Sequence, residues 1–318
     1  MVTAYLARRA LQSVAALVLV TLILFVLLGL VPGGPAAAML GAHPTAAEAS
    51  LIRGALGVHS PFLLQYVAWV GQVLHGNLGF SNYFNEPVSA LLAASLPRTL
   101  ALTITSTLIA LIVAVPLGLA QALRRGTATD HVLRGLTFVA YGTPSFVLGT
   151  VAILIFAVKL RALGAEGPQA AGFGAIITDW HDLTLPVLTL ALLSIGVFSR
   201  NMRSSAVDSL AEDYVRTARS KGADERHVLR RHVLPNALIP LVTLVGLSIP
   251  QIVGGALVTE SVFNIQGMGW QIWQAAQHKD FPVVLGFTLV IGVGAVLGSL
   301  LADLGYAALD PRVRLVRR

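Results

Sequence analysis

The side chains best suited to polar chemistry in this sequence lie in one stretch, DYVRTARSKGADERHVLRRHVLPNALIP, which covers residues 213–240. Acidic and basic residues occur at every second or third position, whereas long runs of Leu, Val, Ile and Ala lie on both sides. Charged groups at this density can hold a protein partner through ion pairs at the rim of a contact. We call residues 213–240 the polar hairpin.

The sequence favours neither catalysis nor cofactor binding by this chain. His227 and His232 are five residues apart rather than four, and the eight histidines show no metal-ligand spacing. The chain has no cysteine, which excludes thiolate nucleophiles, disulfides and Cys-based metal sites. No carboxylate pair or Ser/His/Asp arrangement is evident, and no G-x-x-x-x-G-K-[ST] string is present for binding ATP. We therefore expect no enzyme, metal or cofactor site on this chain.

Composition places the chain in a membrane. Of its 318 residues, 55% are hydrophobic and 12% are charged, about half the charged fraction of roughly 25% that soluble domains carry. Six apolar runs are long enough to cross a bilayer as helices of about 20 residues; they cover residues 10–31, 100–123, 135–158, 183–199, 237–259 and 281–302. Helices satisfy their own backbone groups in lipid, so the sequence predicts an all-α, polytopic membrane protein with six transmembrane helices.

The first apolar run resembles a signal peptide because it follows Arg8 and Arg9 and precedes the small residues GPAAA. A cleavable signal has an apolar core of about 7–15 residues, and this run is longer. We therefore expect it to be retained as the first membrane helix.

Basic residues predict the orientation. Of the 22 Lys and Arg residues, 17 lie in one set of segments: the N-terminus, residues 124–134, residues 200–231 and the C-terminus. Basic residues concentrate on the cytoplasmic side, so both termini and the polar hairpin are expected there. The predicted organisation is a cytoplasmic tail at 1–9, an extracytoplasmic segment with an amphipathic helix at 32–97, a membrane core at 98–309 whose cytoplasmic hairpin region covers 200–236, and a basic cytoplasmic tail at 310–318. The net charge of +7 is thus a topology signal, and nucleic acid is not an expected partner.

The predicted spans contain no driving force of their own. Their cores have no Asp, Glu, Lys, Arg or His, so a proton relay has no ionisable groups to use. The chain is then either a passive pathway or receives energy from a partner.

The polar hairpin is where such a partner could act. The spacing of Ala and Val predicts a helix over 204–222, with Gly222 as its stop and Asp224 as the N-cap of a second helix. A helix–glycine–helix hairpin can transmit a rigid-body displacement; an ordinary solvated loop is the alternative.

The hairpin resembles the cytoplasmic coupling loop of ABC importer permeases, whose motif reads Glu-Ala-Ala, three residues, Gly, nine residues, Ile-x-Leu-Pro. Ala218, Gly222 and the pair Leu234-Pro235 match it, and DYVRTARSKG is similar to the dipeptide and oligopeptide branch. Three positions depart from the motif: Arg216, Thr217 and His232. Further strings agree along the whole chain, among them YLARRALQSV, LLQYVAWVGQVLHGNLGFS, VTESVFNIQGMG and YAALDPRVR.

The resemblance implies a type I ABC importer permease fold in a bacterial inner membrane. It implies a non-catalytic subunit that pairs with a second permease, docks two ATPase subunits or one fused ATPase chain that bind ATP and Mg²⁺, and receives peptides from an extracytoplasmic binding protein. The residues expected to dock the ATPase are Asp213, Tyr214, Arg216, Thr217, Ala218, Lys221 and Gly222. Another cargo, such as nickel or glutathione, remains an alternative, as does a stand-alone carrier or channel; the substrate-binding residues are not indicated.

Two further features have alternative interpretations. The apolar spacing within 61–80 suits either a docking surface for the binding protein or a helix resting at the membrane interface. Glu260 either fixes its loop or contacts the partner subunit or substrate.

Overall fold

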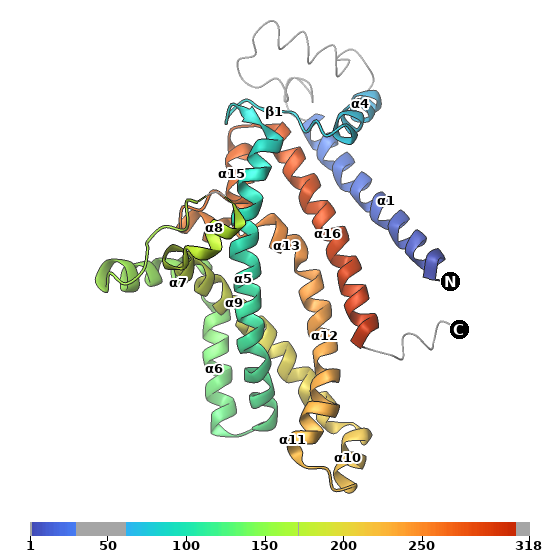
Figure 1. Ribbon diagram of the computed structural model, residues 1–318, viewed down its shortest axis with the longest axis vertical. Coiled ribbons are helices and arrows are strands. Elements are labelled where there is room, and N and C mark those ends of the chain that lie inside the picture. Colours follow the sequence, from blue (N-terminus) through green and yellow to red (C-terminus); the bar gives the residue numbers. More distant parts are fainter. Residues whose placement is uncertain (1, 30–61, 171, 310–318) are drawn as a thin grey trace, which may run out of the picture.

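The computed structural model describes residues 2–29, 62–170 and 172–309, and shows a long helical bundle (Figure 1). The helices that carry the bundle are α1 (Val2–Gly29), α5 (Val88–Leu123), α6 (Ala128–Gly142), α9 (Trp180–Ala211), α12 (Leu234–Leu247), α13 (Ile249–Gly254) and α16 (Phe281–Leu309). Shorter elements connect them: α4 (Phe62–Leu74), α7 (Ser145–Ala152), η1 (Ile153–Lys159), α8 (Phe173–Thr178), α10 (Asp213–Ser220), α11 (Glu225–Val228), η2 (Leu229–Val233), α14 (Leu257–Val262) and α15 (Met268–Gln277). The predicted tail at 310–318 lies outside the described residues.

Four helices in the described part of the chain are long and apolar enough to cross a membrane. They are Val88–Leu123, Trp180–Ala211, Glu225–Gly254 and Phe281–Leu301. A bent pair, Ala128–Gly142 with Ser145–Lys159, raises the count to five, and α1 contributes the shorter apolar stretch Val14–Leu27. This count is compatible with the six predicted helices and supports the predicted all-α membrane fold.

The third predicted span, 135–158, is wrong as a single helix. α6 starts at Ala128 and ends at Gly142, and α7 leaves it at an angle of 98°. Pro144 explains the break, because the residue before a proline is disfavoured in the helical region and Thr143 is extended at ψ 128. A π-helical turn, η1, then continues α7 to Lys159.

Two other predicted boundaries also shift. The helix expected over 204–222 is two helices, because α9 continues to Ala211 and Glu212 is extended at ψ 150 before α10 begins. The fifth helix ends at Gly254 rather than 259, since Gly255 has φ +90 and the chain turns there into α14. The second helix, α5, begins at Val88, inside the segment predicted as 32–97.

α4 packs against α1 and α16 instead of lying free. Tyr66 and Trp69 are buried against Phe25 of α1 and Leu285 of α16, and the Tyr66 hydroxyl hydrogen-bonds Thr21 at 2.8 Å. Other apolar residues of α4, including Leu63 and Leu74, remain exposed, which is compatible with either of the two predicted roles of this helix.

A small β-hairpin, which the all-α prediction omitted, precedes α5. β1 (Phe80–Ser81) pairs antiparallel with β2 (Glu86–Pro87). The buried Asp280 carboxylate, directly before α16, accepts hydrogen bonds from the Ser81 hydroxyl and the Tyr83 N–H. The start of α5 is thereby fastened to the start of α16.

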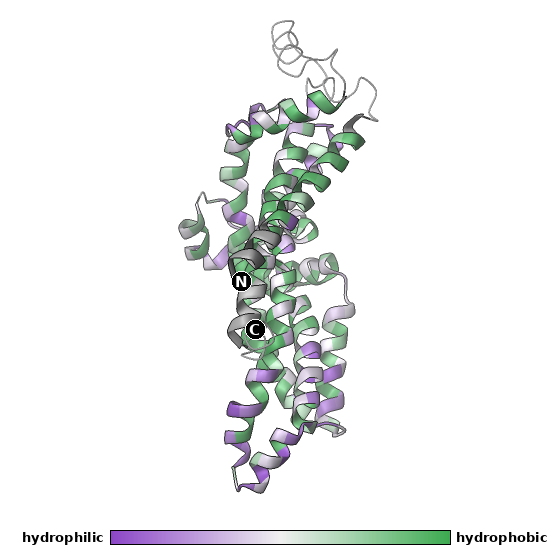
Figure 2. Ribbon diagram, turned by 90° about the vertical axis from the view of Figure 1, so that its right-hand side faces the viewer, coloured by the Kyte–Doolittle hydropathy of each residue, from purple (hydrophilic) through white to green (hydrophobic). Residues whose placement is uncertain are grey.

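α5 and α9 form the centre of the bundle and pack along each other. At Gly118 a Cβ would stand 2.6 Å from the Ser199 carbonyl oxygen, so only glycine permits this approach. Large apolar side chains cover much of the outer surface, among them Leu108, Ile112 and Leu301, and Figure 2 shows the apolar colour along the bundle and polar residues at the α10 end. Apolar surface of this extent marks contact with lipid or with another membrane subunit.

Candidate functional site

The turn inside the polar hairpin has a defined geometry. Gly222 has φ +81, a conformation that favours glycine. Its N–H donates to the Arg219 carbonyl at 2.9 Å and the next N–H, of Ala223, to the Ala218 carbonyl at 3.2 Å, which together make a Schellman motif. The Arg219 guanidinium also donates to both carboxylate oxygens of Glu225, at 2.8 and 3.1 Å. The predicted helix stop at Gly222 is confirmed.

The second helix of the hairpin begins as predicted. Asp224 occupies the N-cap position of α11, with extended backbone at ψ 155. Its side chain makes no capping hydrogen bond, so the position is confirmed without the expected side-chain contact. α11, η2 and α12 then continue as one apolar helical run over Glu225–Gly254.

The inner face of the hairpin belongs to the main core. Val215 of α10, Val228 of α11 and Val233 of η2 are fully buried in one cluster with Met202 and Ala206 of α9. The same cluster includes residues of α5 and α12. The hairpin is therefore packed onto the membrane helices and is not an ordinary solvated loop.

The seven expected docking residues divide between two faces of α10 and its turn. Five are exposed: Asp213, Arg216, Thr217, Lys221 and Gly222. The other two, Tyr214 and Ala218, are half-buried and pack against the chain's own core. The apolar edge of α10 thus packs largely against the core of this chain, and the exposed face that a partner could contact is polar.

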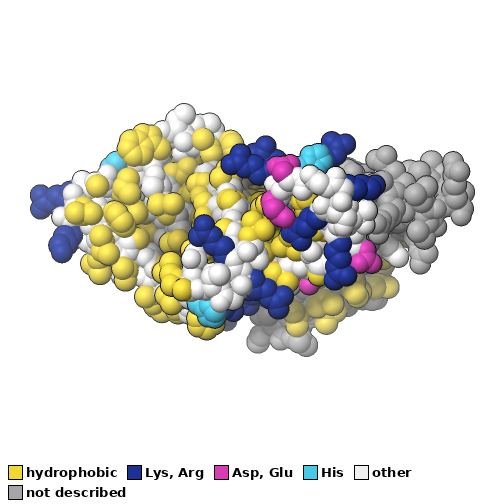
Figure 3. Space-filling model, turned by 90° about the horizontal axis from the view of Figure 1, so that it is seen from below, with side chains coloured by type: hydrophobic (Ala, Val, Ile, Leu, Met, Phe, Trp, Pro, Cys, Tyr) yellow, Lys and Arg dark blue, Asp and Glu magenta, His cyan; other side chains and the backbone are white. Residues whose placement is uncertain are grey.

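That polar face lies within a basic end of the molecule. Viewed from the α10 end, Lys and Arg side chains gather around the hairpin with a few acidic ones (Figure 3). One surface hollow there is lined by Asp224, Arg226, His227, Arg230, Arg231 and Pro235.

A buried ion pair fastens α9 to α6 a short distance from the hairpin. Arg203 donates from Nε and from its terminal nitrogen to the two oxygens of Asp130, at 3.2 and 3.0 Å. Asp130 is buried and also accepts the Gly126 N–H at 3.1 Å, while its own N–H donates to the Thr127 hydroxyl, which caps α6. Arg134 approaches the same carboxylate at 3.4 Å.

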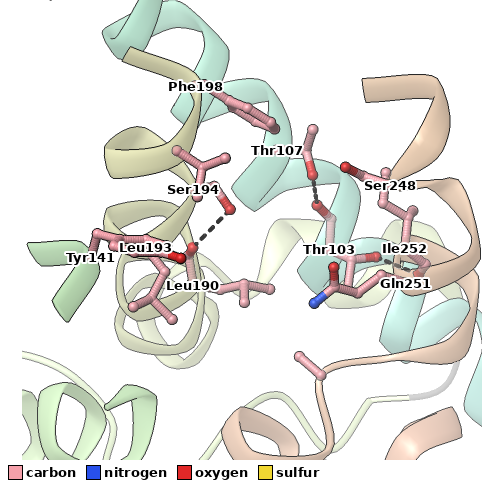
Figure 4. A pocket seen from close by; sticks show the side chains of 12 residues that line it. Thr103, Thr107, Tyr141, Leu190, Leu193, Ser194, Phe198, Ser248, Gln251 and Ile252 are labelled. Atoms are coloured by element: carbon pink, nitrogen blue, oxygen red, sulfur yellow. Dashed lines mark hydrogen bonds between the residues drawn. The ribbon is translucent and has the colours of Figure 1, made fainter. Parts of the chain in front are cut away.

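A cavity of about 290 Å³ lies between α5, α9, Tyr141 of α6 and the α12–α13 junction. Figure 4 shows Ser194 of α9 and Tyr141 on one side, and Thr107, Ser248 and Gln251 on the other. Its twelve lining residues are Thr103, Thr107, Tyr141, Leu190, Leu193, Ser194, Val197, Phe198, Ser248, Gln251, Ile252 and Ala256, none of which is charged.

Sequence reasoning missed this cavity, although a signal was present. Thr99, Thr103 and Thr107 recur every four residues in α5, and this spacing places hydroxyls along one face of a helix. Tyr141, two residues before the break at Thr143–Pro144, lies in the cavity wall.

Glu260 fixes its own loop. Its carboxylate is fully buried and accepts the Thr99 hydroxyl at 2.7 Å and the Trp270 N–H at 2.8 Å. A Cβ at Gly267 would lie 2.5 Å from the Glu260 Oε1 atom, which explains a glycine in the QGMG string. Glu260 thus holds α14 and α15 to α5, and the loop-fixing interpretation is confirmed. Within the described ranges no group of three His, Asp or Glu side chains is arranged to hold a metal ion.

The fold and site together define a helical membrane protein with an exposed polar hairpin at one end and an uncharged internal cavity. The chain belongs to the family of binding-protein-dependent transport system inner membrane components: the family model matches residues 114–315, and the model of the family's N-terminal region matches residues 1–103. It is therefore a non-catalytic, multi-pass subunit of an ABC importer, which works with an ATPase and a binding protein.

Relatives cover the whole chain. A peptide permease protein of Brucella ovis is 38% identical over 98% of this chain and 99% of that protein. The oligopeptide transport system permease protein AppB of Bacillus subtilis is 35% identical over 98% and 99%, and the glutathione transport system permease protein GsiC of Salmonella choleraesuis is 35% identical over 98% of each. Among solved structures, the inward-facing MetNI methionine ABC transporter matches with a TM-score of 0.50 and 17% identity over 67% of this chain and 93% of that one, which supports the fold alone.

Proposed function

We propose that this subunit carries peptides, and that it couples their movement to ATP hydrolysis through the exposed face of α10 and the Gly222 turn. One observation carries the proposal: α9 is a single helix of 32 residues that lines the cavity at Ser194 and reaches the hairpin at Ala211. A displacement of the hairpin therefore moves the cavity wall directly. The peptide cargo is supported by the Brucella and Bacillus relatives.

The docking residues in this proposal are Asp213, Arg216, Thr217, Lys221 and Gly222, with Tyr214 and Ala218 holding α10 on the core. A polar face suits a partner that folds separately and docks on the hairpin, because complementary charges steer the encounter and fix the register of the contact. Because Val215 of α10 is buried in the core, the core follows when the ATPase displaces α10.

The proposed orientation places the hairpin and both termini in the cytoplasm. The basic residues around α10 (Figure 3) and the 17 of 22 cations on one predicted side support it, because positive charge concentrates on the cytoplasmic side. α4 and the β1–β2 hairpin then lie on the outer side, with the segment 32–97 available to a binding protein.

A second permease subunit is also part of the proposal. The described outer surface carries many exposed apolar side chains. Tyr141 and Gln251, which line the cavity, are also exposed. Two such subunits facing each other would enclose a pathway between them. We expect a heteromeric pair, two ATPase subunits or one fused chain, and a bacterial inner membrane location.

Glutathione is the second candidate cargo, favoured by the Salmonella relative.

Reconstitution distinguishes the cargoes. The chain, its partner permease, the ATPase and the binding protein are placed in liposomes, and uptake of labelled dipeptides, longer peptides, glutathione and nickel is measured. Uptake of peptide that needs ATP and every component is the expected result. Uphill uptake by this chain alone, or uptake of glutathione or nickel without peptide, would contradict the proposal.

A further inference from the structure

The four serine and threonine hydroxyls of the uncharged cavity already donate their protons to backbone carbonyls. Thr107 donates to the Thr103 carbonyl at 2.7 Å, Ser194 to the Leu190 carbonyl at 3.2 Å, and Ser248 to the Leu244 carbonyl at 2.9 Å. The one proton of the Thr103 hydroxyl lies between the Thr99 carbonyl, at 2.7 Å, and the Ile252 carbonyl, at 2.8 Å. A hydroxyl has one proton and two lone pairs, so each of these oxygens is left able to accept a hydrogen bond but not to donate one.

Two polar groups at the exposed edge of the cavity add to this pattern. In the described part of the chain neither the Gln251 amide nor the Tyr141 hydroxyl has a hydrogen-bond partner, and Figure 4 shows both at the cavity wall. The Arg200 guanidinium lies over the Tyr141 ring, 4.8 Å from its centre, and is not among the lining residues. The cavity therefore offers several acceptors, few donors and no full charge.

This chemistry selects a particular kind of ligand group. A carboxylate ligand needs hydrogen-bond donors. Of the six polar side chains that line the cavity, the four serine and threonine hydroxyls have no free proton to donate. A group with N–H bonds finds acceptors on both walls, while the lack of a carboxylate avoids the strong ion pair that would trap a cation. The volume of about 290 Å³ is near the lower end of ligand pockets, roughly 300–1,000 Å³, which suits a short piece of an extended chain.

We propose that this cavity is a transit subsite that binds the backbone N–H groups of a peptide as it passes through the subunit. The inference rests on the proposed peptide function and adds the site and the recognised group. Neutral hydrogen bonds are weak individually, so a peptide held by several of them can be released when α9 moves. The subsite would recognise the backbone, which all peptides share, and would not distinguish peptides by their side chains.

The native chain has no cysteine, which permits a direct test. Ser194→Cys places a thiol in the cavity wall. Thr184→Cys is the matched control, because Thr184 also lies on α9 and donates to the carbonyl four residues earlier but lines a different groove. In the assembled, purified transporter without its binding protein, labelling of this chain by a neutral maleimide is timed with a transported peptide or with the same peptide methylated on its backbone nitrogens.

The peptide is expected to slow labelling of Ser194→Cys about fivefold near saturation, because only unoccupied sites react. The methylated peptide should slow it little, and neither should affect Thr184→Cys. Equal protection by both peptides, or no protection of Ser194→Cys, would overturn the inference. Uptake by the wild-type transporter is measured in parallel: peptide uptake without protection contradicts the subsite only, whereas absence of peptide uptake contradicts the proposed function as well.

A second pair of variants tests whether the Thr107 oxygen accepts a hydrogen bond from the peptide. Thr107→Val removes the oxygen and keeps the shape, and Thr107→Ser retains it. Added to Ser194→Cys, Thr107→Val should raise the peptide concentration needed for half protection about tenfold, the loss of roughly one hydrogen bond, and Thr107→Ser should leave it nearly unchanged. Thr105→Val, on α5 but at the other groove, is the control. Equal effects of the Val and Ser variants would overturn the assignment of Thr107.

Discussion

Asp130 and Arg203 join two helices that are far apart in the sequence, through two hydrogen bonds of 3.0 and 3.2 Å. The Asp130 side chain is 1% exposed and that of Arg203 is 21% exposed. Asp130 lies on α6, and Arg203 lies on α9 between the cavity-lining residues and the hairpin. The pair therefore makes α6, which carries Tyr141, move together with the helix that leads to α10.

Removing Arg203 should destabilise the subunit far more than removing the other cation near Asp130. Arg203→Ala leaves a buried carboxylate without its main partner, and we expect a loss of up to about 3 kcal/mol, the lower end for broken buried pairs. Arg134, at 3.4 Å and 45% exposed, is the matched control, since exposed pairs contribute about 0–1 kcal/mol. Thermal unfolding of the detergent-solubilised protein measures both. Equal shifts for the two variants would contradict a special role for the Asp130–Arg203 pair.

The carboxylate of Glu260 should be needed for the α14–α15 loop. Glu260→Ala leaves the Thr99 hydroxyl and the Trp270 N–H without an acceptor, and each unpaired buried group costs about 1–3 kcal/mol. Glu260→Gln keeps the shape and one acceptor, so its loss should be smaller. Glu166→Ala, at an exposed position, should have little effect. Proteolysis of the loop and thermal unfolding measure the destabilisation, which should be largest for Glu260→Ala, smaller for Glu260→Gln and smallest for Glu166→Ala. If Glu260→Gln were as unstable as Glu260→Ala, the hydrogen bonds would not explain the role of Glu260.

Gly222 should affect coupling, and Gly126 offers a matched comparison. Both have positive φ, +81 and +80, and in both an added Cβ would meet no atom within 4 Å. Replacing either glycine with alanine should raise the free energy of the left-handed turn conformation by about 1 kcal/mol. This lowers the population of that conformation roughly fivefold. Only Gly222→Ala is expected to lower the peptide taken up per ATP hydrolysed, by a similar factor. Equal effects at Gly126 would show that the turn of the hairpin has no special part in coupling.

Asn82 tests the proposed orientation. It lies exposed between β1 and β2, at the end of the bundle away from α10 (Figure 1). Asn82→Cys should react with a membrane-impermeant maleimide in intact cells, whereas Ser220→Cys, exposed on α10, should react only after lysis. The reverse pattern would invert the proposed topology.

Hydropathy and charge predicted most of the architecture, because lipid imposes long apolar helices whatever their sequence detail. Pro144 is a local reason for the break between α6 and α7, but the angle of 98° depends on packing between α7 and α9, so 135–158 was predicted as one helix. The extended residue Glu212 carries no local signal, since its sequence neighbours favour helix, and the turn follows from burial of Val215 in the core.

The site was predicted in part for a similar reason. The glycine spacing and charges of the hairpin identified its turn, since φ +81 at Gly222 is a local property. Which edge of α10 faces outward depends on the tertiary core, so the sequence alone does not show that Tyr214 and Ala218 are half-buried against it. The cavity needed four separate helices to come together, and no local pattern contains that information.

Cross-linking from the outer face of α10 tests the central claim most directly. Thr217 is exposed on α10, and Thr178 is exposed on α8. The test variant is Thr217→Cys, and the control is Thr178→Cys. A short bifunctional thiol reagent is added to the assembled transporter, and the adduct is identified by mass spectrometry. An adduct between residue 217 and the ATPase, absent at residue 178, is the result this account predicts. An intact complex in which residue 217 gives no adduct and remains freely labelled would contradict docking of the ATPase on α10.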